Sequence, residues 1–285
     1  MKENYLTQEN LEAFIQSAFK EDVGEGDHST LASIPKGQMG RAQLIIKEEG
    51  IIAGLKLAEM IFHSYDADLE VKLLMEDGQQ AKKGDIGLTV AGKAASILTT
   101  ERLVLNCMQR MSGIATKTNQ LCQLISHTNA KLLDTRKTTP NFRMLEKWAV
   151  AIGGGENHRF ALYDMVMLKD NHIDFAGGIA AAIASTKQYL KENLLDLKIE
   201  VETRNLEEVK EVLSVGGVDV IMLDNMGNDE MRKAVSLING KVATEASGGI
   251  TEDTLKGVAE CGVDFISVGA LTHHVKSLDI SLKAY

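Results

Sequence analysis

The second half of the sequence repeats a short β-branched strand followed by a helical pattern. The last four candidate strands end about 22 residues apart, the period of a compact strand-helix unit. Continuous apolar strands between amphipathic helices indicate a parallel sheet with a covered outer face. No glycine-rich dinucleotide fingerprint follows the first strand, so the pattern favours a closed or nearly closed α/β barrel over a doubly wound sheet. The candidate strands are Lys131–Asp134, Met165–Leu168, Leu197–Glu202, Val218–Asp224, Val242–Glu245 and Val263–Val268.

The first part of the sequence has a different pattern. Leu11 to Phe19 shows helical spacing, and residues 40–98 show strands and turns interrupted by a helix at Leu55–Phe62. A further helix is predicted from Ile97 to about Ser112. We therefore predict an N-terminal α+β domain at residues 1–112, a barrel domain at 113–275, and a C-terminal segment at 276–285 that packs back on the N-terminal domain.

The overall charge excludes some classes of partner. A formal net charge of −9 argues against non-specific binding to nucleic acid or to anionic membranes, which requires a basic surface. No apolar run reaches the roughly 18–20 residues that span a bilayer. The first residues, Met1-Lys-Glu-Asn-Tyr, lack the apolar core of a secretory signal. We expect a cytoplasmic protein without a membrane or nucleic-acid partner.

Each predicted barrel strand ends in a polar or glycine-rich group. The carboxyl ends of barrel strands form the rim where such enzymes assemble their active sites. A solvated loop explains any one of these groups, but six in the same register indicate a site. The groups begin at Asp134, Lys169, Glu202, Asp224, Glu245 and Gly269.

Cationic side chains gather in two of these loops, against the sign of the net charge. Arginine offers a planar fork that matches a carboxylate or phosphate, and lysine offers a compact point charge. Such crowding is tolerable only if carboxylates or a bound polyanion neutralise it. Salt bridges to Asp134, Asp164 and Asp170 are the structural alternative. The set is Arg136, Lys137, His158, Arg159 and Lys169, with Arg102 in the helix before the barrel.

Glycines follow the last two strands, in Ser247-Gly248-Gly249 and Val268-Gly269-Ala270. Glycine lets backbone N–H groups approach an anion, and the usual phosphate site of a barrel lies at its last two strands. A tight turn is the alternative for Ser-Gly-Gly alone. The position of both loops favours phosphate binding.

Two acidic residues end neighbouring strands beside this predicted phosphate site. Paired carboxylates next to phosphates hold Mg²⁺ or ribose hydroxyls. The alternative is that Glu202 and Asp224 only balance the cationic set.

Eight motifs, in order, strongly resemble the quinolinate phosphoribosyltransferase family. The resemblance covers nearly the whole chain, including Gly26-Asp-His-Ser-Thr near its start. Asn141 and Ala161 depart from the glycines of many relatives, which affects local loop shape. The motifs are Thr100-Glu-Arg-Leu-Val-Leu-Asn, Arg110-Met-Ser-Gly-Ile-Ala-Thr, Asp134-Thr-Arg-Lys-Thr-Thr-Pro, Gly153-Gly-Gly-Glu-Asn-His-Arg, Lys169-Asp-Asn-His-Ile, Leu223-Asp-Asn-Met, Glu245-Ala-Ser-Gly-Gly-Ile and Gly269-Ala-Leu-Thr-His.

The resemblance implies an incomplete (β/α) barrel with an N-terminal sandwich-like domain, in a homodimer or a hexamer built from dimers. It implies transfer of phosphoribosyl from phosphoribosyl pyrophosphate to quinolinate, with decarboxylation, in NAD biosynthesis. The reaction requires Mg²⁺ and no organic cofactor. Lys137, Lys169, Glu202 and Asp224 match catalytic positions, and Glu202 and Asp224 also match positions near the metal and ribose. Substrate-binding positions are Arg102 from the partner subunit, Thr135, Arg136, Lys137, His158, Arg159, Lys169, Ser247, Gly248, Gly249, Val268, Gly269 and Ala270.

Three alternatives stay open at this point. A phosphoribosyltransferase-like protein linked to molybdenum transport resembles the same family closely. A nicotinate-using enzyme is a second, although one carboxylate does not require so many cations. A non-catalytic binding protein on a barrel scaffold is the third, and the intact Glu202, Asp224 and glycine loops argue against it.

Overall fold

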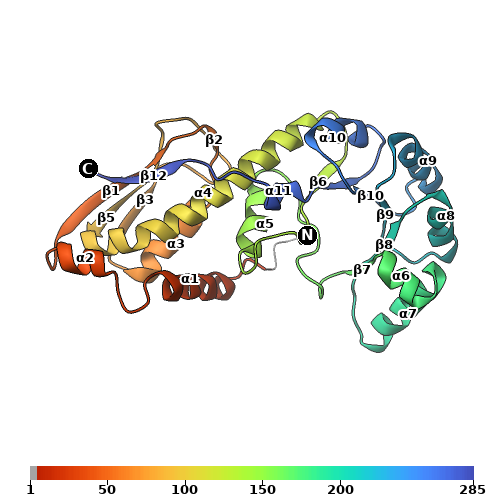
Figure 1. The fold of residues 1–285 in the computed structure, drawn as a ribbon, viewed down its shortest axis with the longest axis horizontal. Helices are drawn as coiled ribbons and strands as arrows, with labels where there is room; N and C mark the ends of the chain where they lie inside the picture. Colours follow the sequence, from red (N-terminus) through yellow and green to blue (C-terminus); the bar gives the residue numbers. More distant parts are fainter. Residues whose placement is uncertain (1–4) are drawn as a thin grey trace. The chain divides into compact units, whose positions relative to one another are not determined.

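The computed structural model of the chain describes residues 5–285 and forms two compact units (Figure 1). The first unit contains the described residues up to 119, with 138–154 and 271–285; the second contains 120–137 and 155–270. Residues 1–4, which begin the stretch expected to lack a signal, lie outside the described part. No helix among the described residues combines the length and the apolar character needed to cross a membrane.

The first unit is built on an antiparallel sheet with strand order β12-β1-β5-β3. Alternate side chains of β1, including Leu44 and Ile46, are buried, as expected for a sheet with one covered face. The C-terminal strand β12 pairs with β1, with Ile46 opposite Ile280. The strands are β1 (Met39–Ile46), β3 (Glu70–Leu73), β5 (Ile86–Lys93) and β12 (Ile280–Ala284), and β2 (Gly50–Ile51) pairs separately with β4 (Gln80–Ala81).

Helices complete the first unit. They are α1 (Gln8–Asp22), α2 (His28–Ser33), α3 (Leu55–Tyr65), α4 (Ala94–Leu124) and α5 (Arg143–Ile152). A short helix, α11 (Ala270–His273), also belongs to this unit from Leu271 onward. Helix α4 is the longest element and runs beside the sheet in Figure 1. At its centre, Arg110 donates to the buried carboxylate of Glu146 on α5 and to backbone carbonyls near the C-terminal segment.

The prediction that this long helix ends near Ser112 is wrong, since α4 continues to Leu124. The Ser-Gly-Ile-Ala-Thr stretch contains weak helix formers, which suggested an end. Tertiary contacts override that preference. The Ser112 hydroxyl accepts from the Ala53 N–H, and the Thr116 hydroxyl accepts from the Ile51 N–H. Gly113 lies so close to the backbone of Lys276 that a Cβ would overlap it.

The second unit is a parallel six-stranded sheet with strand order β6-β11-β10-β9-β8-β7. The edge strands β6 and β7 are not paired with each other in the described chain, so the barrel is incomplete, which confirms the predicted fold class. All six predicted strands are present, with boundaries shifted by a few residues. They are β6 (Lys131–Leu133), β7 (Val166–Leu168), β8 (Ile199–Thr203), β9 (Val220–Asp224), β10 (Ala243–Ser247) and β11 (Phe265–Ser267).

Helices follow the strands of the second unit and lie on the outer side of the sheet (Figure 1). They are α6 (Asp170–Ala176), α7 (Ile179–Glu192), α8 (Leu206–Val215), α9 (Asn228–Ile238) and α10 (Glu252–Ala259). Because strand side chains alternate, Ile199, Val201 and Thr203 of β8 lie on one face and Glu200 and Glu202 on the other. The sheet therefore places acidic side chains on the face away from the helices.

The division by packing differs from the boundaries predicted from sequence. Residues 138–154, expected in the barrel domain, belong to the first unit together with α4 up to residue 119. The contacts of Glu146 explain this assignment, because its carboxylate accepts from Arg110 on α4 and from Thr139. A helix in the middle of the chain is thereby part of the N-terminal core.

Candidate active site

The order of strands in the six-stranded sheet determines the order of chemical groups along its carboxyl edge. Because parallel neighbours end at the same edge, the groups follow one another as the strands do. Register confirms the neighbours: Ser267 pairs with Leu133, Ser247 with Asp224, and Leu168 with Val201. From β6 to β7 the groups are residues 134–137, then 268–270, 247–249, 224–225, Glu202 and Lys169.

Asp134, at the end of β6, organises the cationic loops. Its fully buried carboxylate accepts from the Asn157 side chain at 2.7 Å and from the backbone N–H of His158 at 2.9 Å. Asp164 similarly accepts from the N–H groups of Phe160 and Ala161. These two carboxylates hold loop backbone in place, in addition to any effect on nearby cations.

Arg159 is the buried cation of the site, only 6% exposed. Its Nη1 donates to the Met165 carbonyl at 3.2 Å. Burial and the positive charge of Arg136 both lower the pKa of Arg159, while Glu200 and Asp164 oppose that effect. Two guanidinium groups close enough to repel each other form a site that an anion stabilises.

His158 lies between two buried glutamates. Its Nε2 is 2.9 Å from Oε2 of Glu200 and 3.3 Å from Oε2 of Glu245. Burial lowers the pKa of His158, but hydrogen bonds and charges from both glutamates raise it to about 10. Burial raises the pKa of Glu200 to about 7, and Glu245 adds to this, while His158 opposes it.

The other ring nitrogen of His158 faces the backbone. Nδ1 accepts the backbone N–H of Arg159 at 2.8 Å. Nε2 is therefore the ring nitrogen that donates toward the two glutamates.

Glu202 and Asp224 are neighbours at the carboxyl ends of β8 and β9. Glu202 pairs with Met222, two residues before Asp224, so both carboxylates lie on one face. Burial and then the charge of Asp224 raise the pKa of Glu202, and Lys169 opposes this. Lys169 Nζ is 4.0 Å from Glu202 Oε2. A cation at this pair would relieve the repulsion that raises the pKa.

The two glycine loops leave neighbouring strands of the sheet. Gly248 and Gly249 have φ angles of 94° and 61°, a region that other residues rarely occupy. A Cβ on Gly248 would overlap the side chain of Asn225, which itself donates to Asp224 at 2.6 Å. The backbone N–H of Val268, in the other loop, donates to the Leu133 carbonyl. The glycines thus keep loop and carboxylate close together.

The remaining predicted residues are more exposed. The Thr135 hydroxyl accepts the Lys137 N–H at 3.0 Å, and the Lys137 side chain lies at the surface. Arg102 belongs to the first unit, where it is exposed on α4 and forms no ion pair or hydrogen bond with any described residue. The second unit therefore brings together every predicted site residue except Arg102.

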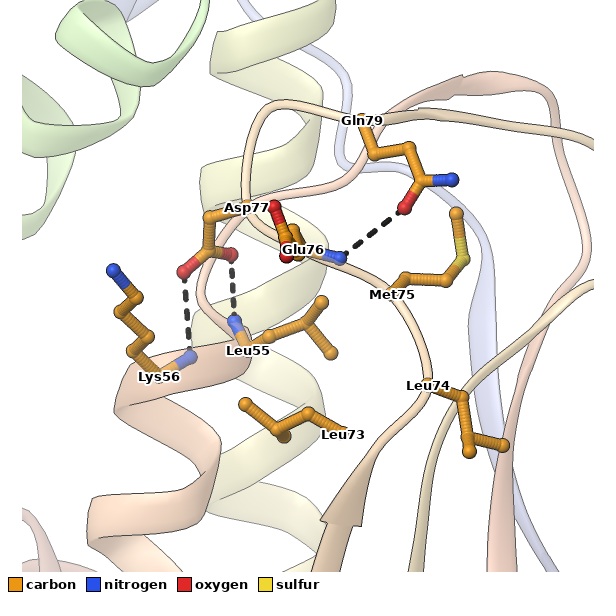
Figure 2. Close-up of a pocket in the computed structure, with 8 residues that line it drawn as sticks. All are labelled: Leu55, Lys56, Leu73, Leu74, Met75, Glu76, Asp77 and Gln79. Atoms are coloured by element: carbon orange, nitrogen blue, oxygen red, sulfur yellow. Dashed lines mark hydrogen bonds between the residues drawn. The ribbon is translucent and has the colours of Figure 1, made fainter.

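A separate hollow of about 800 Å³ lies in the first unit, beside the start of α3 (Figure 2). Figure 2 shows Asp77 accepting from the backbone N–H groups of Leu55 and Lys56, at 2.8 and 3.3 Å. Its lining contains one lysine and two acidic residues but none of the predicted site residues. Asp77 caps a helix here, and the hollow holds no concentration of positive charge.

Two residues of the site, Glu200 and Glu245, were not assigned a role from sequence. Both are acidic residues inside parallel strands, at 0% and 2% exposure. Sequence could have indicated a role from the residue type alone. A carboxylate inside a parallel strand is rarely buried without a partner, so each glutamate implies one. The identity of that partner, His158, depends on a loop path that sequence does not specify.

Comparisons with known proteins agree with this geometry. Residues 27–112 match the N-terminal domain of quinolinate phosphoribosyl transferase, and residues 114–283 match its C-terminal domain. The chain is 48% identical to a chloroplastic nicotinate-nucleotide pyrophosphorylase (carboxylating) of Arabidopsis thaliana, over 96% of this chain and 82% of that protein. A probable enzyme of the same name from Bacillus subtilis is 43% identical, over 95% and 92% of the two chains.

Solved structures show the same fold. The nicotinate-nucleotide pyrophosphorylase of Francisella tularensis is 38% identical and superposes with a TM-score of 0.92, covering 100% of this chain and 99% of that one. The two domain matches, the identity along nearly the full chain and the fold all lead to one assignment. The chain belongs to the quinolinate phosphoribosyltransferase family.

Proposed function

We propose that the carboxyl edge of the six-stranded sheet transfers phosphoribosyl from phosphoribosyl pyrophosphate to quinolinate, with loss of CO₂. Nicotinate-nucleotide diphosphorylase (carboxylating) activity, a step of NAD biosynthesis, is the activity of this family. The products are nicotinate mononucleotide, diphosphate and CO₂. The observation that carries the assignment of the site is the strand order, which puts two phosphate-type loops between a cationic loop and a carboxylate pair.

Quinolinate is a pyridine with two adjacent carboxylates. We assign Arg136 and Arg159 to direct contact with these carboxylates, and His158, whose ring nitrogens face Glu200, Glu245 and the Arg159 N–H, to the support of Arg159. Two observations support this assignment: the two arginines repel each other, and Arg159 is buried. Both favour binding of an anion between the arginines over their solvation by water. A fork of cations on both carboxylates would also fix the direction of the ring nitrogen.

Phosphoribosyl pyrophosphate would place its 5′-phosphate on the loops 247–249 and 268–270. Lys137 and Lys169 would lie near its diphosphate. The Glu202 and Asp224 carboxylates fit Mg²⁺, because they are close enough for Asp224 to raise the pKa of Glu202. Bound Mg²⁺ would neutralise charge on the diphosphate leaving group.

Departure of diphosphate leaves positive charge on the ribose ring. Glu202 or Asp224 would stabilise that charge electrostatically, in a position fixed by their strands. The pyridine nitrogen then attacks the ribose carbon, which leaves the pyridine ring cationic. This ring accepts the electron pair released when the 2-carboxylate leaves as CO₂, so the chemistry requires no organic cofactor.

Arg102 would reach the site of a partner subunit, in a homodimer or a hexamer of dimers. Its exposure on α4, with no partner among the described residues, supports this assignment. We also propose a cytoplasmic location, although the Arabidopsis relative is named chloroplastic. Fractionation of the source cells would test the location.

The test of the reaction is incubation of the protein with Mg²⁺, phosphoribosyl pyrophosphate and either quinolinate or nicotinate. We expect nicotinate mononucleotide and one equivalent of CO₂ from quinolinate, and no product from nicotinate. Product from nicotinate at a comparable rate would contradict the assignment of a pocket for two carboxylates. Omission of Mg²⁺, with a chelator present, should abolish turnover.

A further inference from the structure

Beneath the carboxylate pocket lies a buried group of three side chains: His158, Glu200 and Glu245. They come from a loop, from β8 and from β10, and are 8%, 0% and 2% exposed. Their ligand-type atoms all lie within 4.8 Å of one another. Burying two carboxylates costs several kcal/mol unless hydrogen bonds and charge compensate them. His158, which contacts both carboxylates, supplies that compensation.

Both glutamates use one oxygen on the His158 ring. The other oxygen, Oε1 of each, is buried and has no hydrogen-bond partner among the described residues. Their hydrogen bonding is therefore concentrated on one target, Nε2 of His158. Because β9 lies between β8 and β10, the two carboxylates approach the ring from different strands of a rigid sheet. The ring is held from two directions.

The fixed ring in turn holds the residue that follows it. Nδ1 of His158 accepts the backbone N–H of Arg159 at 2.8 Å. The backbone N–H of His158 itself donates to the Asp134 carboxylate. Arg159 is then fixed at its backbone by His158 and at its guanidinium by the Met165 carbonyl. A series of hydrogen bonds thus runs from the sheet interior to the buried arginine of the carboxylate pocket.

We infer that Glu200 and Glu245 are positioning residues for quinolinate, acting through His158 on Arg159. They lie on the inner face of the sheet, below the predicted ligands of the substrates, and hold a preformed carboxylate pocket. This inference rests on the proposed function, since it assumes that Arg159 contacts quinolinate. It predicts that substitutions of these glutamates raise the KM for quinolinate and leave the KM for phosphoribosyl pyrophosphate nearly unchanged.

Kinetics of matched variants test the inference. Glu200→Ala and Glu245→Ala should each raise KM for quinolinate at least 10-fold and change KM for phosphoribosyl pyrophosphate less than 2-fold. Glu200→Gln and Glu245→Gln keep an oxygen that accepts from Nε2–H, so they should stay within about 3-fold of the wild type. Equal increases for both substrates, or no increase for either, would overturn the inference.

A second measurement requires no variant of the glutamates and applies even if the alanine variants do not fold. In wild-type protein with ¹⁵N-labelled histidine rings, the His158 resonances should show a proton on Nε2 that is held in a hydrogen bond. Comparison with His158→Gln would assign them among the seven histidines. A ring whose only proton lies on Nδ1 cannot donate to the two glutamates, and this result would overturn the inference.

The same three side chains could instead hold a metal ion. Elemental analysis of the purified protein, after dialysis against a chelator, distinguishes the two cases. We expect no bound metal at this site and no change in metal content in Glu200→Gln. One equivalent of metal that is lost in Glu200→Gln would replace the positioning role with a metal site. Turnover of quinolinate by the wild type tests the proposed function independently.

Discussion

Gly248 shows how one missing side chain connects the phosphate loop to the carboxylates. Its φ of 94° is unfavourable for any other residue, and a Cβ would displace the side chain of Asn225. Asn225 donates to Asp224, so a change in the loop would be transmitted to the carboxylate pair. A substitution at Gly248 is therefore expected to displace Asn225 and, through it, the Asp224 carboxylate.

We predict that Gly248→Ala lowers kcat/KM for phosphoribosyl pyrophosphate at least 10-fold, equivalent to about 1.4 kcal/mol. Gly240→Ala is the matched control, because Gly240 also has a positive φ of 68° but a Cβ there meets no neighbour within 4 Å. Both variants should lose similar stability in thermal unfolding. Equal activity of the two would show that the Asn225 contact is unimportant.

At the residue scale, charge and glycine after each strand are local signals, and the strand order places these groups along one edge of the sheet. Asn141 is a similar case. Its φ of 61° explains why glycine is suited to this position, and asparagine is the residue that best tolerates the same region. Glu245 carried this signal as the start of a strand-end group, but its pairing with Glu200 depends on a histidine from a loop distant in sequence.

Helix α2 illustrates the element scale, because its start depends on one aspartate. The Asp27 carboxylate accepts from the N–H and hydroxyl of Thr30 and from the hydroxyl of Thr99 on α4. The Gly26-Asp-His-Ser-Thr motif is therefore a helix cap that also fastens α2 to the long helix. The hydrogen bonds to Thr30 lower the pKa of Asp27 below its usual value of 3.8.

We predict that Asp27→Ala lowers the free energy of unfolding by about 1 kcal/mol at neutral pH, the usual contribution of a cap. Asp27→Asn keeps an accepting oxygen and should lose less. Because the folded-state pKa is lowered, the charge of Asp27 stabilises the protein above its ordinary pKa, and this part is lost as the pH falls below about 4. Urea unfolding at pH 7 and at a series of lower pH values, down to about 2, would measure both effects. A wild-type advantage over Asn that persists at low pH would contradict this account.

Sequence located the six strands of the parallel sheet because periodicity within an element is local, but it did not predict α2, α5 or β12. The predicted length of α4 was also wrong. Its polar centre is helical because Ser112 and Thr116 bond to the backbone of residues 51–53, a contact between distant segments that no local pattern contains.

On the scale of the whole molecule, the first unit contains three separate stretches of chain and the second contains two. Sequence predicted boundaries near residues 112 and 275, with residues 276–285 packing back on the N-terminal domain. Packing assigns α5 to the first unit through Glu146, a contact that only the folded chain reveals.

The proposed sharing of a site between subunits gives a whole-molecule prediction. Arg102→Ala and Asp224→Ala variants should each be inactive, because each removes a group from every site of a homodimer. Subunit exchange between them should restore up to about one quarter of wild-type activity, through hybrid dimers with one intact site. Persistent inactivity in a mixture that mass spectrometry shows to be exchanged would exclude a shared site. Mixing Arg102→Ala with Glu202→Ala should behave in the same way.

The pairing of β12 with β1 has a consequence for synthesis of the chain. The ribosome makes the middle strand β1 long before Ile280–Ala284, the strand that covers its free edge. Until β12 is made, the hydrogen-bonding groups on that edge of β1 stay open to water and to other nascent chains. The second unit, whose strands are all complete by residue 267, can fold earlier. Stalled or prematurely ended translation would therefore expose the first unit to aggregation and spare the second.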